Sequence, residues 1–488
     1  MSRILLLFLA GILLTCSRTI PSQSLPGLIL NKKPVVKIPE GLSYTFGYLE
    51  VPETRDDPRS ASIQLPFYHF KCRGDSCAED PVIYTVGGPG ATTMPSAAYL
   101  KYYQYLWDRD VILVEQRGTY YAKPHLGCPE WTEAIYQTQF PSVSDQEADS
   151  LLMAAAIACK DRYRKKGINL SAYRTTSIAQ DIIDLMDLLK IRQANLLTIS
   201  YSTKIAQVLM REHPERIRSV VMDSPLPLEV SWDEESIQML MEGYEQLFSA
   251  CEADSGCNAK YPELRNRFFT ALKEASSDPV EITISHEGDP MIFNLTGLDF
   301  ALLLAPGSND EVAGTPKRIS DWLNGDQASL IKTLEAMLSG PGYGDGIGMR
   351  ISVWCAEEMA FAGDEVIEAQ TNRYPEFLGA ESELFSREIC DYWGVEPAPS
   401  IDNQPITSDI PVLLMSGEFD AITPSRWAAA MHATLPNSDH IIFPGWMHSV
   451  TTYWSNPCGM EVANTFFNDP KKDPVIDCFG ELMSPAWE

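Results

Sequence analysis

The segment "NLLTISYSTK", residues 195–204, decides which fold this sequence predicts. Its apolar first half ends at Ser200, and the chain then turns polar before a helical pattern begins. A buried strand that runs into a helix through a single serine is typical of a nucleophile elbow, the sharp turn that lifts a serine hydroxyl above the edge of a sheet. The usual elbow motif is G-x-S-x-G, but here Thr198 and Ser202 occupy the two glycine positions. Ser200 is therefore either a catalytic nucleophile on an altered turn or an ordinary loop serine.

Short apolar runs alternate with helical patterns on both sides of this segment. Continuous apolar strands separated by helices indicate a mostly parallel sheet with helices on both faces, so the predicted fold class is α/β. The predicted strands cover residues 62–70, 81–88, 110–116, 195–200, 218–224, 411–420 and 440–445, and the predicted helices around the serine cover residues 176–190 and 203–213.

The alternation of strands and helices is interrupted once. Residues 226–404 have the pattern of long helices, and the alternation returns in residues 405–488. A sheet whose last strands follow such an interruption predicts a helical insertion into one domain, here a large cap over the site. We therefore expect a core made of residues 41–225 and 405–488, with a mainly helical cap between them.

Residues 1–16 have the features of a secretory leader. Arg3 supplies the positive end, and the apolar run of residues 4–14 is too short to span a bilayer. The end of the leader, "LLTC", is similar to a bacterial lipoprotein signal, in which Cys16 is lipidated and becomes the new N-terminus. Thr15 is a less usual residue at that place, so simple cleavage nearby stays an alternative. Residues 17–40 are polar and proline-rich without periodicity, which predicts a tether.

Eleven cysteines favour an extracytoplasmic protein, either a periplasmic or cell-envelope lipoprotein or a secreted protein. In an oxidising compartment ten cysteines can pair, and Cys16 is the natural one left over. The alternative is a set of buried free thiols. Closeness in sequence and order along the chain suggest the pairs Cys72 with Cys77, Cys128 with Cys159, Cys251 with Cys257, Cys355 with Cys390, and Cys458 with Cys478.

Charge and motif content argue against two kinds of partner. A formal charge of −28 disfavours nucleic acid and anionic membranes, because both are bound through clustered cations. The sequence has no C-x2-C pair and no H-E-x-x-H motif, so we expect no metal site. Membrane attachment is expected only through a lipid on Cys16.

Two later residues complete a candidate catalytic set with Ser200. In the fold that displays a nucleophile elbow, the acid follows a late strand and the histidine follows the last strand. Asp420 comes directly after "PVLLMSG", and His448 lies in "PGWMHS" after the last predicted strand. His448 would take the proton from Ser200, and Asp420 would orient the imidazolium. Asp223 is the reserve acid; in the plainer interpretation Asp420 only supports its turn and His448 is a surface residue.

A tetrahedral intermediate also needs hydrogen-bond donors for its oxyanion. "VGGPG", residues 86–90, follows a predicted strand at the place where such a fold supplies one backbone N–H group, which we assign to Gly88. The second donor would be the residue after the nucleophile, Tyr201. The alternative is that the glycine-rich segment is an ordinary turn.

Several segments together resemble the proline iminopeptidase and tripeptidyl aminopeptidase branch of the α/β-hydrolases, from about residue 42 to the end. They are "GGPG", "VEQRGTYYAKPHLGC", "NLLTISYSTKIAQVLMREHPERIRSVVMDSPLP", "SACEADSGCNAKYPEL", "WCAEE" and "GEFDAITPSRWAAAMHATLPNSDHIIFPGWMHS". The resemblance implies the α/β-hydrolase fold and a serine exopeptidase that releases proline or a short peptide from a free N-terminus, without a cofactor. It also implies the roles already given to Ser200, Asp420, His448, Gly88 and Tyr201.

The chain departs from the family pattern at three places. The family's GGSYG is Thr198 to Ser202, and Glu115 and Glu357 stand where the family has aspartate. Recognition of a free amino terminus needs a buried acidic group, and the resemblance points to Glu357 and Glu358. The alternative is that both are solvated charges on a helix.

Two other functions stay open at this point. The same triad performs acyl transfer on esters, so an esterase acting on small esters is one alternative. A catalytically silent binding protein, which kept the fold after its elbow changed, is the other.

Overall fold

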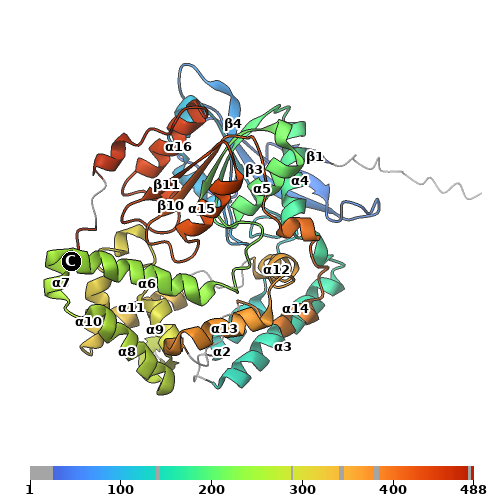
Figure 1. Cartoon of the computed structure of the whole chain (residues 1–488). Helices are drawn as coiled ribbons and strands as arrows, with labels where there is room; N and C mark the ends of the chain where they lie inside the picture. The colour runs from blue at the N-terminus through green and yellow to red at the C-terminus, as the bar shows by residue number, and fades with distance from the viewer. Residues whose placement is uncertain (1–25, 139–142, 287–288, 340–345, 378–383, 482–484) are drawn as a thin grey trace, which may run out of the picture.

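The computed structural model describes residues 26–138, 143–286, 289–339, 346–377, 384–481 and 485–488. The expected leader, its lipidation site at Cys16 and residues 17–25 of the expected tether lie outside the described residues. In Figure 1 the sheet and its flanking helices form the upper half, and a mainly helical part lies below. Within the described residues, no helix combines the length and the apolar character that crossing a membrane requires.

The core is a nine-stranded sheet that changes from antiparallel to parallel across its width. From edge to edge, the strands are β1 (Gly27–Leu30), β2 (Tyr44–Pro52), β3 (Ser62–Phe70), β5 (Arg109–Val114), β4 (Ala78–Thr85), β6 (Ala194–Ile199), β7 (Ile217–Asp223), β10 (Val412–Gly417) and β11 (Ser438–Phe443). The pairs from β1 to β5 in this order are antiparallel, and all later pairs are parallel. The expected α/β fold with a mostly parallel sheet is confirmed.

Helices on both faces explain why the strands are continuously apolar. All six residues of β6 are buried. Leu196 packs in a cluster with α4 (Thr175–Leu188) and α5 (Ser202–Glu212), whereas Leu197 packs in a second cluster with α16 (Cys458–Asn468). Successive side chains of a strand point to opposite faces, so each strand contributes to both clusters.

The first edge of the sheet differs from expectation. Gly27–Leu30, inside the expected tether, form β1 and pair antiparallel with β2. Leu28 packs against one core cluster and Ile29 against the other. The tether assignment is therefore wrong for these residues, because their apolar side chains extend the core at the edge of the sheet.

Between β7 and β10 the described residues are mostly helical and include one antiparallel pair of strands. The elements are α6 (Ser236–Ala253), α7 (Ser255–Lys260), α8 (Leu264–Ser277), β8 (Val280–His286), β9 (Asp289–Leu295), α9 (Gly297–Leu304), α10 (Thr315–Leu323), α11 (Ala328–Ser339), α12 (Ile347–Val353), α13 (Asp364–Arg373) and α14 (Arg387–Trp393). Their apolar cluster includes Phe419 and Met447, the neighbours of Asp420 and His448. The interior of the cap is thus continuous with both of the loops that carry these residues. Helix α12, in contrast, packs into the core of the sheet.

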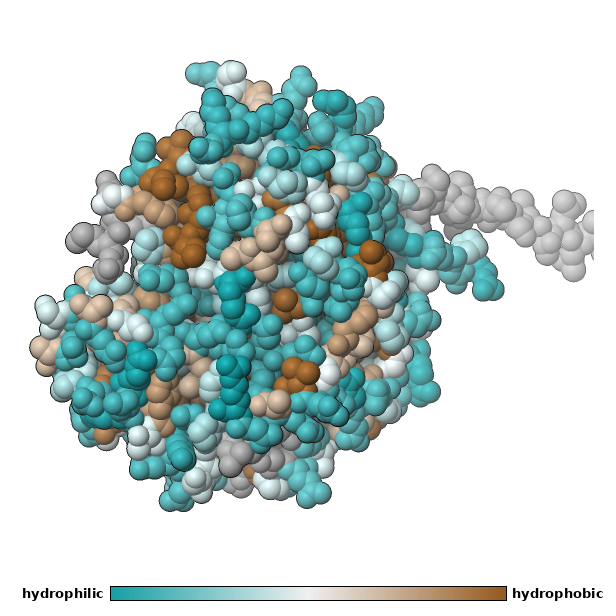
Figure 2. All heavy atoms as spheres, viewed as in Figure 1, coloured by the Kyte–Doolittle hydropathy of each residue, from teal (hydrophilic) through white to brown (hydrophobic). Residues whose placement is uncertain are grey.

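Ten cysteines form disulfides in the five pairs given above. Their Cα–Cα distances run from 5.1 to 6.1 Å, within the usual range for disulfides. On the face seen in Figure 2 the surface is mostly hydrophilic, and apolar residues gather in small separate patches.

Candidate active site

Ser200 occupies the turn between β6 and α5 in a left-handed conformation. Its φ is +59°, which is uncommon for a residue with a side chain. The Ser200 N–H donates to the Asp223 carbonyl oxygen at 2.9 Å, so the turn is bound to the end of β7. Strained backbone of this kind persists where its surroundings hold it, which is the geometry of a nucleophile elbow.

The two residues that replace the usual elbow glycines are used as hydrogen-bonding groups. Ser202 Oγ accepts from the Ile199 N–H at 2.8 Å and donates to the Thr85 carbonyl oxygen at 2.8 Å. The Thr198 hydroxyl donates to the Val221 carbonyl oxygen at 3.2 Å. Both side chains are buried, so these bonds satisfy polar groups that would otherwise be unpaired.

The glycine that the turn requires lies in another segment. A Cβ atom on Gly87, just beyond β4, would lie 2.7 Å from Ser200 Cβ and 3.0 Å from the Tyr201 backbone nitrogen. Real Cβ atoms do not approach other atoms so closely, so only glycine fits there. In the usual motif, glycines inside the elbow permit close packing around the serine. Here Gly87, in the loop after β4, permits it.

Asp420 and His448 form a direct hydrogen bond. His448 Nδ1 lies 2.9 Å from Asp420 Oδ2, and the Asp420 side chain is fully buried. The other carboxylate oxygen accepts from the N–H groups of Ile422 at 2.9 Å and Thr423 at 2.8 Å. Asp420 thus supports its turn and also orients the imidazole. Among the described residues, no hydrogen bond joins Ser200 Oγ to His448, so their contact stays a prediction.

Two carboxylates favour the protonated, charged form of the imidazole. Burial alone would lower the pKa of His448, but attraction to Asp420, their hydrogen bond and attraction to Asp223 outweigh it and raise the pKa above its usual value. Burial likewise opposes the ionised form of Asp420, yet His448 and the two backbone N–H groups hold the pKa of Asp420 below its usual value. The imidazole is therefore well suited to accept a proton.

Asp223, the reserve acid, is fully buried near this pair. Among the described residues, its carboxylate accepts from Ser224, Val450 and Thr451 and not from the imidazole. Burial is the main reason that the pKa of Asp223 is raised. Asp420 is the carboxylate in direct contact with His448.

The loop with the expected oxyanion donor is held from two sides. Gly88 has a φ of +118°, and its carbonyl oxygen accepts from the Arg350 guanidinium on α12 at 3.1 Å. The buried Glu115 carboxylate accepts from the Thr92 hydroxyl at 3.0 Å and the Thr93 N–H at 2.9 Å. Burial raises the pKa of Glu115. The roles of Gly88 and Tyr201 as donors stay predictions.

Glu357 lies in a buried network and not on a solvated helix face. It belongs to the π-helical turn Trp354–Glu358, which continues α12. Its carboxylate accepts from the Thr175 N–H at 2.7 Å and from the Thr175 hydroxyl, which also bonds the Tyr201 hydroxyl at 2.8 Å. Burial raises the pKa of Glu357 to about 7.

Glu358 is buried too, and it is already neutralised. Its carboxylate pairs with the Lys204 ammonium group on α5 and accepts from the Trp232 N–H at 3.1 Å. Nearby, the Val230 carbonyl oxygen lies 3.4 Å from Lys204 Nζ. One oxygen of Glu229 is buried without a hydrogen-bond partner among the described residues. The interpretation of Glu357 and Glu358 as solvated charges is therefore wrong.

Sequence reasoning missed Lys204, Thr175, Gly87 and Glu229. Lys204 was the detectable one, because a lysine in the first turn of a helix that is predicted to pack on the sheet indicates a charged partner. Gly87 lies in the glycine-rich segment 86–90, which by itself does not show that this residue faces the elbow, and Thr175 and Glu229 have no local signal. They become visible only when distant segments are brought together.

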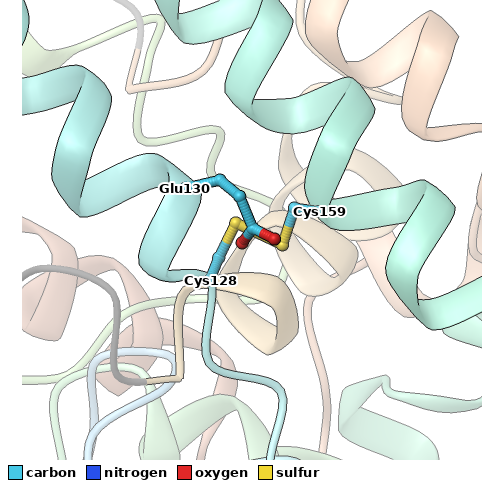
Figure 3. Close-up of side chains that lie close together, drawn as sticks. All are labelled: Cys128, Glu130 and Cys159. Atoms are coloured by element: carbon cyan, nitrogen blue, oxygen red, sulfur yellow. A yellow bond between two sulfur atoms is a disulfide. The ribbon is translucent and has the colours of Figure 1, made fainter.

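The described residues contain one group of side chains with the spacing of metal ligands, Cys128, Glu130 and Cys159. Figure 3 shows that the two sulfur atoms are joined in a disulfide, with Glu130 beside it. Arg162 donates to the two oxygens of Glu130 at 2.9 and 3.0 Å. The disulfide and the ion pair therefore already use these groups.

Two protein families match parts of this chain. The family described as alpha/beta hydrolase fold matches residues 80–248, which include the elbow. The family described as TAP-like protein matches residues 378–478, which include Asp420 and His448. The two matches together contain the three residues of the candidate triad.

Similar proteins include the serine protease Hip1 of Mycobacterium tuberculosis and of Mycobacterium bovis. Each is 22% identical over 451 residues, which cover 86% of this chain and 84% of the relative. Among solved structures, an esterase from Thermogutta terrifontis is 12% identical with a TM-score of 0.36, covering 87% of this chain and 99% of that chain. An esterase from Exiguobacterium antarcticum is also 12% identical with a TM-score of 0.36, covering 84% and 96%.

Proposed function

Since this chain belongs to the α/β-hydrolases and resembles their serine peptidases of the tripeptidyl aminopeptidase type, we propose that it is a serine aminopeptidase that releases proline or a short peptide from free N-termini. The observation that carries the proposal is the hydrogen bond between Asp420 and His448 in a chain whose Ser200 sits on a strained elbow. The esterase and silent-protein alternatives are addressed by the same experiment.

In this mechanism Ser200 Oγ attacks the scissile carbonyl carbon while His448 Nε2 takes the hydroxyl proton. Asp420 keeps Nδ1–H in place and stabilises the imidazolium. The oxyanion accepts hydrogen bonds from the backbone N–H groups of Gly88 and Tyr201. His448 then returns the proton to the leaving amine, and water hydrolyses the acyl-enzyme by the same proton transfers. No metal or organic cofactor takes part in these steps.

A free α-ammonium group needs a negative partner when it is buried. Glu358 already has Lys204, so in this proposal Glu358 holds Lys204 and Glu357 is the acceptor. The pKa of Glu357, about 7, allows it to be ionised near neutrality, and an ammonium group beside it would favour that form. The unpartnered oxygen of Glu229 makes that residue the second candidate acceptor.

One observation favours an esterase as the second candidate. The Lys204 ammonium group cancels one of the two acidic charges expected to recognise a substrate amine. Substrates without a free amine, such as small esters, suit a site with less negative charge. The same triad performs either acyl transfer.

We also propose that the protein works outside the cytoplasm, as a secreted protein or as a lipoprotein attached through Cys16. Five disulfides support an oxidising compartment, because such bonds are rare in the cytosol. Intact-mass measurement of protein recovered from cells tests the lipid on Cys16. The expected mass includes an acylated cysteine. An unmodified N-terminus would contradict the lipoprotein proposal and leave the secreted protein.

The proposed activity is tested with full-length mature protein, a panel of short peptides and simple esters. Mass spectrometry of the products is expected to show release of proline or a short peptide from free N-termini, and little from acetylated ones. Ser200→Ala should lose both this activity and labelling by a fluorophosphonate probe. Turnover of esters alone would support the esterase, and no labelling of the wild type would support the silent protein.

Recognition of the amine is tested by Glu357→Gln, with Glu357→Asp as the matched variant that keeps the charge. Glu357→Gln is expected to raise KM for free N-termini by about tenfold, which corresponds to about 1.4 kcal/mol, and to leave ester turnover unchanged. An equal loss on both substrates would show that Glu357 does not contact the amine.

A further inference from the structure

Asp223 is hydrogen-bonded both to the turn that carries Ser200 and to the loop that carries His448. Its backbone carbonyl oxygen accepts from the Ser200 N–H at 2.9 Å. Its carboxylate accepts from the Val450 N–H at 2.9 Å, and from the Thr451 N–H at 2.7 Å and hydroxyl at 2.5 Å. One fully buried residue therefore binds the nucleophile turn through its main chain and the histidine loop through its side chain.

The next residue extends this attachment. The Ser224 hydroxyl donates to the Asp223 carboxylate at 3.1 Å and accepts from the Ser449 N–H at 2.9 Å. The three consecutive N–H groups that follow His448 are thus bound by two consecutive residues at the end of β7. Ser224 and Ser449 have φ values of +53° and +70°, conformations that the surrounding contacts must hold.

The charge of Asp223 also acts on the imidazole. Asp420 and Asp223 are the two carboxylates whose attraction favours the charged form of His448. Tyr84 and Tyr105 also interact electrostatically with Asp223, but burial raises the pKa of Tyr84 to about 12 and that of Tyr105 well above its usual value. Both phenols are therefore neutral in the range where the enzyme would work.

We propose that Asp223 is a positioning residue for His448: its carboxylate fixes the loop behind the imidazole, and its charge stabilises the imidazolium that forms when Ser200 is deprotonated. The inference rests on the proposed function, in which His448 is the general base. It differs from the reserve-acid role, because Asp420 keeps its bond to Nδ1 and Asp223 acts alongside it.

The kinetic test compares Asp223→Asn with Thr451→Val. Asp223→Asn should lower kcat per fluorophosphonate-labelled site by about 10- to 100-fold with little change in KM, less than the loss of a general base. The acid limb of its pH profile should move to lower pH, because one negative charge near the imidazole is gone. Thr451→Val removes one donor and keeps the charge, so it should lower kcat less and leave the acid limb in place.

A second readout does not depend on catalysis. The histidine resonances of isotope-labelled protein, without the fluorophosphonate, are titrated by NMR. The resonance of His448 is assigned as the one that is missing in His448→Gln. A lower pKa of His448 in Asp223→Asn supports the proposal; an unchanged pKa together with unchanged kcat per labelled site overturns it. If the wild type neither hydrolyses substrate nor labels at Ser200, the proposed function fails, while the titration still decides whether Asp223 acts on His448.

If Asp223→Asn does not fold, Ser224→Ala combined with Thr451→Val takes its place. This pair removes two hydroxyl contacts around the carboxylate and keeps its charge. A lower kcat per labelled site with unchanged KM supports the positioning role. Unchanged kcat overturns it.

Discussion

The ammonium group of Lys204 lies on the carboxylate of Glu358, and only 2% of either side chain is exposed. The pair joins the helix after Ser200 to a turn 154 residues further along the chain. Taking two charges out of water is unfavourable, and each is tolerated here because the other neutralises it. The contact therefore couples α5, beneath the nucleophile, to the turn that carries Glu357.

We predict that Lys204→Met lowers the free energy of unfolding by about 3–5 kcal/mol, because it leaves the Glu358 carboxylate buried without a cation. The double variant Lys204→Met with Glu358→Leu should recover much of that loss, since apolar pairs often replace buried ion pairs without penalty. Thermal unfolding of the oxidised protein measures both. Lys317→Met, which breaks an exposed pair with Asp321, is the control and should change little. A single variant as stable as the double one would contradict the prediction.

Gly87→Ala should lower kcat by at least about 100-fold. The added Cβ would press on Ser200 and on the Tyr201 backbone nitrogen, and loss of one oxyanion donor has an effect of that size. The rate of fluorophosphonate labelling and the steady-state kinetics measure it. Gly307→Ala is the matched control, because a Cβ there meets no atom closer than 3.5 Å. Near-normal labelling of Gly87→Ala would show that the turn can move away.

Ser202→Gly, which restores one glycine of the usual motif, should destabilise the protein by about 1–3 kcal/mol. The substitution leaves the buried Ile199 N–H without its acceptor. Ser202→Ala loses the same bond without adding backbone freedom and should be slightly less destabilised. Chemical unfolding followed by fluorescence compares the three proteins, and a glycine variant more stable than the wild type would refute the argument.

Glu357 should make stability depend on pH. Its pKa is raised to about 7 in the folded protein, so the folded state holds this proton more tightly than the unfolded state. The resulting contribution, about 3 kcal/mol, is present at acidic pH and is lost as pH rises from about 4.5 to about 7. Glu357→Gln removes this dependence and should raise the melting temperature relative to the wild type at pH 8 but not at pH 4. A difference in melting temperature between Glu357→Gln and the wild type that is the same at pH 4 and at pH 8 would contradict the prediction.

Much of the fold follows from local patterns in the chain. β3 is the predicted strand 62–70 in full, and β6 and β7 are each shifted by one residue from the predicted strands. Apolar runs of strand length between helical patterns carry this information, because burial on both faces needs apolar residues at every position. Asp420 and His448 were predicted in the same way, since each follows a recognisable late strand.

Contacts between distant segments decided the rest. The apolar pattern marked Ser200 but could not show that Gly87 makes room for the turn, that Lys204 neutralises Glu358, or that Asp223 binds the loop after His448. Each of these depends on the distance between residues that are far apart in sequence, and a local pattern contains no such distance. Local composition thus settles which elements form and in what order, whereas the charge and strain of the candidate site arise only when the packed sheet, α5 and α12 bring their side chains together.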